Sequence, residues 1–367
     1  MSNVERVFSS EYMYWAKTKS HSRFNLATSG VANLPLSELP VKLEDLEISG
    51  ASAYGYEPLQ QALAAKSGVS TDCIVAATGT SMANHLAMAA LLEPGDQILI
   101  ETPGYELLAS AARYLGAHVE FFDRRFEDGF AVDPDEVKRK ITPRTRLIVV
   151  TNLHNPSSAL IDEATLRALG EMARRAGAHV LVDEVYLDGA FDLASDLTRS
   201  AFHLGDEFIA TNSLTKIYGL SGLRCGWIIA QPVLARRIWR LNDLFGAIPA
   251  HTAERLSVVA LGALDKIRAR SKAIIDTNRE VLSRSLRSCD GLDVMIPDFG
   301  TVVFPRLRHG SVEELCDLLR NKYETTVVPG GFFGAPDHFR VGMGGETPLL
   351  EEGLTRLSSA VAELAQR

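Results

Sequence analysis

The sequence predicts an α/β fold: a large domain built on a mainly parallel, doubly wound sheet, and a smaller α+β domain beside it. Between residues 74 and 230, short apolar runs alternate with longer helical patterns, as in a sheet with helices on both faces. Polar side chains follow several runs directly, and ligands bind at that edge of such sheets. The 367 residues suffice for two domains, which we expect over 46–265 and over 1–45 together with 266–367.

The strands of this sheet are expected where the apolar runs lie, with the helices between them. The strands fall at 75–77, 97–101, 118–122, 147–150, 180–182, 208–210 and 227–230. The helices begin near Leu59, Asn84, Leu107, Asp133, Asp162 and Val233. The run at 147–150 is apolar at every position, which is typical of a strand buried on both faces.

The second domain is expected to mix helices and strands. One amphipathic helix is predicted over 253–271, running out of the large domain. Further helices are predicted at 274–286, 312–319 and 349–365, and strands at 292–295, 301–305, 326–328 and 338–341. The N-terminal segment, with a helix at 10–17 and a loop at Gly30, is expected to join this domain. Gly30 could let the backbone come close to another group, but we interpret it as a plain turn, the commoner role of a loop glycine.

Composition and charge limit the classes of function. The net charge is −8, without a basic block, which argues against nucleic acid as a partner. No apolar run reaches the roughly 18 residues of a membrane helix, and residues 1–19 lack the apolar core of a signal peptide. The four cysteines are scattered, without the spacing of a metal site: Cys73, Cys225, Cys289 and Cys316. We therefore expect a cytoplasmic protein with reduced thiols.

A single lysine, Lys216, lies among small polar residues just after the apolar run at 208–210. An amine held at a strand end can form a Schiff base with a carbonyl, and desolvation lowers its pKa toward reactivity. Arg224 follows eight positions later and could bind a phosphate through two parallel hydrogen bonds. Taken alone, these residues fit an ordinary surface loop with two cations equally well.

Other polar residues follow neighbouring runs, and their convergence favours an enzyme site. Gly79, Thr80 and Ser81 open a helix, where free N–H groups favour an anion, although the same residues also serve as plain helix caps. The ends of the later strands carry Tyr105, Asn155, Asp183 with Tyr186, and Lys216. Chance would scatter such residues over both edges of the sheet.

In this order, the motifs resemble those of fold-type I pyridoxal-phosphate enzymes, specifically the class I/II aminotransferases. The motifs are Ser213-x-x-Lys216 with an arginine eight residues on, Asn155-Pro156, Asp183-x-x-Tyr186 and Phe339-Arg340-Val341. The resemblance spans about residues 54 to 340. It implies an aspartate-aminotransferase-like fold and pyridoxal 5′-phosphate as the cofactor.

The resemblance also implies roles for individual residues. Lys216 would form the Schiff base with the cofactor and then move the proton at the substrate's Cα. Asp183 would keep the pyridine nitrogen protonated, Tyr186 and Asn155 would donate to the phenolic oxygen, and Tyr105 would stack on the ring. The phosphate would be bound by Gly79, Thr80, Ser81, Ser213 and Arg224.

Three further assignments follow from the resemblance. Arg340 would bind the substrate's α-carboxylate, a task that suits the guanidinium fork. Tyr54, with Tyr56 as the alternative, would reach the phosphate of a neighbouring subunit in a homodimer. The family usually has a glycine where this chain has Ser158, so the loop after Asn155 is expected to differ in shape.

The resemblance implies an aminotransferase that moves an amino group from an amino acid to a 2-oxo acid. A lyase, a racemase or a cyclising synthase would use the same Lys216 and Asp183 and stays open. A non-catalytic, cofactor-binding regulator is disfavoured because no basic or helix-turn-helix segment is appended. A nucleotide-binding Rossmann enzyme is disfavoured because no G-x-G-x-x-G follows the first strand. His154 is interpreted as a hydrogen-bonded loop residue in preference to a substrate contact.

Overall fold

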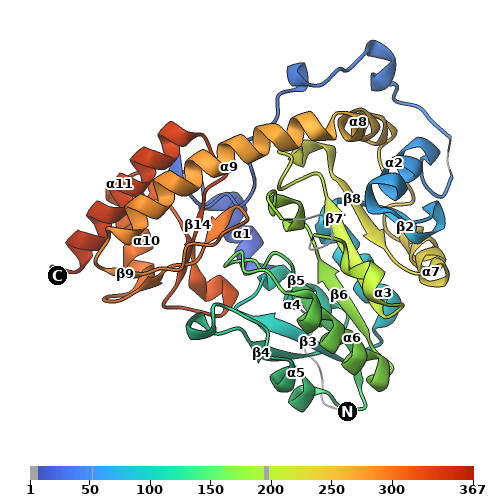
Figure 1. Cartoon of the computed structure of the whole chain (residues 1–367), viewed down its shortest axis with the longest axis horizontal. Coiled ribbons are helices and arrows are strands. Elements are labelled where there is room, and N and C mark those ends of the chain that lie inside the picture. The colour runs from blue at the N-terminus through green and yellow to red at the C-terminus, as the bar shows by residue number, and fades with distance from the viewer. Residues whose placement is uncertain (1–6, 52, 194–197) are drawn as a thin grey trace.

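In a computed structural model, which describes residues 7–51, 53–193 and 198–367, the main feature is a seven-stranded sheet (Figure 1). Its strands are β2 (Ile74–Thr78), β3 (Gln97–Thr102), β4 (His118–Asp123), β5 (Thr145–Thr151), β6 (His179–Asp183), β7 (Phe208–Ser213) and β8 (Cys225–Ile229). The spatial order is β2-β8-β7-β6-β5-β3-β4, and only β8 runs antiparallel to its neighbours. The predicted α/β fold with a mainly parallel sheet is confirmed.

Helices connect the strands and begin and end at sequence signals for helix termini. They are α2 (Glu57–Ser67), α3 (Gly79–Leu91), α4 (Glu106–Tyr114), α5 (Pro134–Lys140), α6 (Glu163–Ala176) and α7 (Pro232–Asn242). For α6, the Asp162 carboxylate accepts a hydrogen bond from the Thr165 amide at 2.7 Å, which satisfies a free N–H of the first turn. Gly177 ends this helix in the left-handed conformation (φ 64°), where a glycine has no steric penalty.

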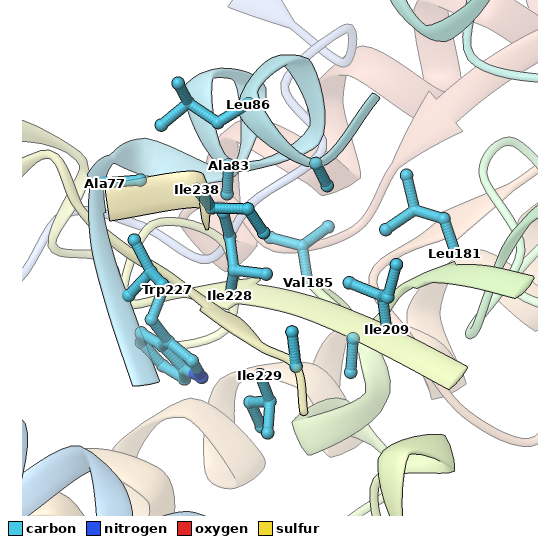
Figure 2. Close-up of a cluster of buried hydrophobic side chains, with 14 of the residues drawn as sticks. Ala77, Ala83, Leu86, Leu181, Val185, Ile209, Trp227, Ile228, Ile229 and Ile238 are labelled. Carbon is cyan, nitrogen blue, oxygen red and sulfur yellow. The ribbon is translucent and has the colours of Figure 1, made fainter. Parts of the chain in front are cut away.

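Both faces of the sheet are covered, which explains the apolar runs within its central strands. On β6, Leu181 packs in the hydrophobic cluster that contains Leu86 of α3 (Figure 2). Val180 and Val182 pack instead in the cluster that contains Leu169 of α6. Because successive strand residues point to opposite faces, this arrangement buries β6 from Val180 to Asp183.

The C-terminal elements form a separate group on the left of Figure 1, where three helices pack around short strands. The helices are α9 (Leu264–Arg287), α10 (Val312–Lys322) and α11 (Thr347–Leu364). The strands are β9 (Leu292–Asp293), β10 (Val302–Val303), β11 (Arg306–Leu307), β12 (Thr325–Thr326), β13 (Val328–Pro329) and β14 (Phe339–Gly342). The N-terminal segment joins this group through β1 (Phe24–Asn25), which pairs in parallel with β12.

The two groups of elements have separate hydrophobic clusters. The residues that flank Arg340 on β14 belong to the C-terminal cluster, whereas Leu214 and Ile217, on either side of Lys216, belong to the cluster of the large sheet. The short helix α1 (Glu11–Thr18) lies between the groups (Figure 1). The boundaries that we expect for the two domains, near residues 45 and 265, stay a prediction.

The predicted helix over 253–271 is wrong in its extent. Instead, α8 (His251–Gly262) ends at a glycine, and α9 then continues without a break through the gap predicted at 272–273. Glycine is a poor helix former, which weakens the helix at this residue. Within α9, Lys272 Nζ donates to Asp276 at 2.6 Å, and such a pair one turn apart supports the helix.

Candidate active site

Parallel strands of the sheet end at one edge, where predicted site residues follow them, and β3 leads to Tyr105. β5 leads to Asn155, β6 ends at Asp183 and β7 leads to Lys216. β8 runs in the opposite direction, and its first residues pair with the end of β7. Arg224, which directly precedes β8, therefore lies at the same edge as the amine of Lys216.

A pocket of about 260 Å³ lies at this edge. The predicted site residues that line it are Thr80, Ser81, Tyr105, Asn155, Asp183, Tyr186, Ser213, Lys216, Arg224 and Arg340. Additional lining residues that the sequence did not single out include Tyr12, Met13, Ala16, Ser29 and Asn84. The structure thus brings together ten predicted residues that are spread over 261 positions of the chain.

Asp183 is buried at the end of β6 and is held by two donors. Asn84 Nδ2 donates to Oδ2 at 2.8 Å, and the amide of Val185 donates to Oδ1 at 3.1 Å. Thr211 Oγ1 donates to Asn84 Oδ1 at 2.6 Å, which orients the Asn84 amide toward the carboxylate. Burial raises the pKa of Asp183 to about 6, although the Asn84 hydrogen bond opposes this shift.

The Lys216 amine lies in the pocket and donates to Ser29 Oγ at 3.0 Å. Burial is the main cause that lowers the pKa of Lys216. The N-terminal segment passes close to this lysine: the Val31 amide donates to the Lys216 carbonyl at 2.7 Å, and a Cβ on Gly30 would lie 3.2 Å from the same oxygen. The interpretation of Gly30 as a plain turn is therefore wrong, because its missing side chain permits this close approach.

Two tyrosines line the pocket on the side of the N-terminal segment. Tyr186 is buried, and its hydroxyl donates to Ser29 Oγ at 2.8 Å. The Tyr105 hydroxyl donates to Met13 Sδ at 3.6 Å. Burial raises the pKa of both tyrosines above the ordinary value, so both phenols keep their protons and act as hydrogen-bond donors at neutral pH.

One corner of the pocket has free hydrogen-bond donors that fit a phosphate. Thr80 Oγ1 is buried and has no hydrogen-bond partner among the described residues. The Arg224 guanidinium makes only long contacts, 3.4 Å to the Thr78 carbonyl and 3.5 Å to the Ser221 carbonyl. Both groups lie beside the N-terminus of α3, where amide N–H groups favour an anion. The residues present therefore fit the phosphate of pyridoxal phosphate.

Gly79, at the start of α3, does not line the pocket but determines where Arg224 lies. Its φ is +75°, and a Cβ there would lie 2.3 Å from Arg224 Nη2. Gly79→Ala is therefore expected to displace the guanidinium and to weaken binding of pyridoxal phosphate about 10- to 100-fold, or about 1–3 kcal/mol. Titration of the cofactor-free protein with pyridoxal phosphate, followed by absorbance, measures the affinity.

Gly177→Ala is the matched control for this substitution. Gly177 has a similar φ of +64°, but a Cβ there would meet no atom within 4 Å. This variant should lose some stability through backbone strain and keep its affinity for the cofactor. Equal affinities in the two variants would contradict the assignment of Arg224 to the phosphate.

Arg340 is buried and connects β14 to the edge of the large sheet. Nη1 donates to Asn155 Oδ1 at 2.8 Å, and Nη2 donates to the Tyr12 hydroxyl and to the Ala27 carbonyl, both at 3.0 Å. Nε is buried and has no partner among the described residues. An unpaired donor on a fixed guanidinium in a pocket is suited to a carboxylate.

Tyr54 and Tyr56 do not line the pocket of their own chain. Tyr54 is exposed, and its hydroxyl donates to Asp243 at 2.8 Å. The Tyr56 hydroxyl accepts from Arg255 at 3.4 Å. Their assignment to a neighbouring subunit's phosphate stays a prediction.

Two loop residues settle the shape of the segment after Asn155. His154 is buried with both ring nitrogens paired, at 2.6 Å to Ser157 Oγ and 2.7 Å to the Pro103 carbonyl, in line with its interpretation as a hydrogen-bonded loop residue. Ser158 adopts φ 64°, a conformation that favours glycine. Its hydroxyl donates to the Val302 carbonyl at 2.8 Å, which offsets part of the strain and ties the loop to β10.

The residues that the sequence missed and that contact the predicted ones include Asn84, Ser29, Tyr12 and Met13. Asn84 carried a usable signal, because an amide on the otherwise apolar face of α3 must be paired when buried. Ser29 and Tyr12 carried none, since both belong to the N-terminal segment, far along the chain from their partners Lys216 and Arg340.

Comparisons with known proteins agree with this geometry. The family model described as aminotransferase class I and II matches residues 48–357. The chain is 32% identical over 357 residues to a capreomycidine synthase of Streptomyces vinaceus, covering 94% of this chain and 91% of that protein. A PLP-dependent aminotransferase from Streptococcus suis superposes with a TM-score of 0.89 at 25% identity, over 96% of both chains. The PLP-dependent cyclase OrfR superposes with a TM-score of 0.87 at 25% identity, over 98% of both chains.

Proposed function

We propose, from the premise that this chain belongs to the class I and II aminotransferases and depends on pyridoxal phosphate, that Lys216 carries the transfer of an amino group from an amino acid to a 2-oxo acid. The observation that carries this proposal is the pocket at the edge of the sheet. There the amine of Lys216, the buried carboxylate of Asp183 and the guanidinium of Arg340 all line one cavity.

Pyridoxal phosphate, when bound, supplies an aldehyde that takes up the amino group and a ring that withdraws electrons from the substrate's Cα. Lys216 Nζ is the group that holds the cofactor and moves the Cα proton, since its lowered pKa makes a neutral amine accessible. The Asp183 carboxylate, which lines the pocket, would hold a proton on the ring nitrogen. Thr80 and Arg224 bind the phosphate.

Arg340 orients the substrate by binding its α-carboxylate. Two arginines are found among the described lining residues, and Arg224 is assigned to the phosphate. No lining arginine of this chain then remains for a second carboxylate, so an acidic amino acid is not favoured as the donor. Tyr12, which is hydrogen-bonded to Arg340, and Met13 line the same pocket and would contact the bound substrate.

The test is a titration of the cofactor-loaded protein with single amino acids and no acceptor. A transaminase loses its visible absorption and releases one 2-oxo acid per site, while the cofactor is recovered in its amine form. Adding a 2-oxo acid then restores the absorption. Release of ammonia with the 2-oxo acid would show elimination instead and would contradict the proposal.

Ring closure of an amino acid is a second candidate function, and the similarities to a capreomycidine synthase and to the cyclase OrfR favour it. The same titration separates the two reactions. A cyclising synthase yields a cyclic amino acid and no 2-oxo acid, and the cofactor keeps its visible absorption after turnover.

A homodimer is supported by exposed apolar side chains in the segments next to α2 and α7. They are Leu43, Ile48 and Tyr54, which precede α2, and Leu244 and Phe245, which follow α7. A second copy would cover them and bring Tyr54 toward its phosphate. Light scattering should give twice the chain mass, and a monomer would contradict this.

A cytoplasmic location is supported by the four free cysteines. No helix in the described ranges is long and apolar enough to cross a bilayer.

A further inference from the structure

Among the described residues, the Lys216 amine has a single hydrogen-bond partner, and that partner is a hydroxyl. Lys216 Nζ lies 3.0 Å from Ser29 Oγ, and the Tyr186 hydroxyl donates to the same oxygen at 2.8 Å. Ser29 is 5% exposed and lines the pocket. No described residue accepts a hydrogen bond from Ser29 Oγ, so its proton stays available at the amine or in the pocket.

Ser29 is fixed relative to Lys216 by its backbone. The Thr301 hydroxyl donates to the Ser29 carbonyl at 2.7 Å. Two residues later, the Val31 amide donates to the Lys216 carbonyl at 2.7 Å, and Gly30 between them leaves room for this approach. The hydroxyl is therefore held at the amine by contacts on both sides of Gly30.

A hydroxyl suits an amine that must alternate between two charge states. It accepts a hydrogen bond from an ammonium and donates one to a neutral amine without any movement of heavy atoms. A carboxylate partner could only accept, and would hold the ammonium form. Asp183, Arg224, Arg340 and Tyr12 act on Lys216 through space, and Tyr186 donates to the same Ser29 oxygen. None of these groups is hydrogen-bonded to Nζ in the part of the chain that the structure describes.

We propose that Ser29 is a further catalytic residue, whose hydroxyl holds the free amine of Lys216 in both charge states while that amine moves the Cα proton. This proposal rests on the proposed function of Lys216. When Nζ takes the proton from Cα, the resulting ammonium donates to Ser29 Oγ. After Nζ returns the proton, the neutral amine accepts a hydrogen bond from the Ser29 O–H group. Ser29 itself therefore neither gains nor loses a proton.

Ser29→Ala tests the proposal in two independent ways. In the loaded enzyme, kcat should fall about 10- to 100-fold while KM changes less than about 3-fold, because a proton-transfer group is disturbed and Arg340 is not. In the cofactor-free protein, the pH midpoint for modification of Lys216 by an amine reagent, read by peptide mass spectrometry, should move to lower pH. The buried ammonium loses its acceptor there, which disfavours the charged form.

Two variants serve as controls. Thr28→Ala removes the neighbouring hydroxyl, whose side chain is exposed, and should behave as the unmodified enzyme. Ser29→Thr keeps a hydroxyl at the amine and should restore most of the turnover and the midpoint. If Ser29→Thr loses as much as Ser29→Ala, the hydroxyl is not the active feature and the proposal is overturned.

The outcomes separate this proposal from the proposed function. Borohydride treatment of the unmodified enzyme loaded with pyridoxal phosphate should leave the cofactor's mass on the Lys216 peptide. Absence of that mass overturns the role of Lys216 and, with it, that of Ser29. Presence of the mass, combined with a Ser29→Ala variant whose kcat and midpoint equal those of the unmodified enzyme, overturns Ser29 alone.

Discussion

Lys216→Ala is expected to lower turnover by about 10⁴-fold, because it removes the group that moves the proton at the substrate's Cα. The loss should appear in kcat, since Arg340 and the phosphate-binding residues stay in place to bind substrate and cofactor. Rapid-mixing measurements of the first turnover check this directly.

The Lys216→Ala result has a chemical rescue and a matched control. Removing the side chain leaves space beside Ser29, so small amines such as methylamine at high concentration should restore part of the rate. Lys42→Ala removes an exposed lysine and should leave turnover unchanged. A Lys216→Ala variant with more than about one tenth of the original rate would contradict the assignment of this amine.

Asp183→Asn is expected to lower kcat roughly 10²- to 10³-fold. The amide keeps the size of the side chain and one acceptor oxygen for Asn84, but it cannot carry the charge that holds a proton on the ring nitrogen. Removing one partner of a buried charge pair costs about 3–5 kcal/mol, and the lower part of this range corresponds to the expected loss of rate. Single-turnover rates, measured with the cofactor bound, give the effect on the chemical step.

The same substitution should stabilise the cofactor-free protein at high pH. The pKa of Asp183 is raised from 3.8 to about 6, so the folded protein holds this proton more tightly than the unfolded chain. The carboxylate therefore destabilises the fold progressively as the pH rises from about 4 to about 6, and fully above that. At pH 8, urea unfolding should show Asp183→Asn to be about 1–3 kcal/mol more stable, and the gain should shrink at pH 5.

Glu184→Gln is the control that separates the two effects. Glu184 is the next residue, is also buried, and its pKa is raised to about 7, mainly by burial. It does not line the pocket. This variant should gain stability at pH 8 in the same way and keep its turnover within about 2-fold. Equal losses of turnover in Asp183→Asn and Glu184→Gln would contradict the role of Asp183.

The fold was largely predictable because its signals are local. The apolar run at 147–150 and its neighbours indicated strands buried on both faces, and the residues after those strands had to meet at one edge once the strands were parallel. The antiparallel direction of β8 was not readable from the sequence. It nevertheless places Arg224 at the predicted edge.

The parts of the site that escaped prediction depend on contacts between distant segments. Ser29 reaches Lys216 across 187 positions, and Asn84 reaches Asp183 across 99. Nothing in the residues around Ser29 indicates such a partner, because a serine before a glycine is common in turns. The end of α8 at Gly262 was missed for a different reason: one glycine in an amphipathic pattern does not by itself end a helix.

The hydrophobic cluster that supports Lys216 is separate from the one that supports Arg340. The two parts of the enzyme can therefore unfold at different temperatures. If heat unfolds the C-terminal helices first, the residues around Lys216 still bind the cofactor. Arg340 is then no longer in place to bind the substrate's carboxylate. Such a partly unfolded enzyme keeps the visible absorption of its bound cofactor but has no activity. During slow warming, catalysis should then disappear before the visible band does, and an assay of bound coenzyme alone would overstate the amount of working enzyme.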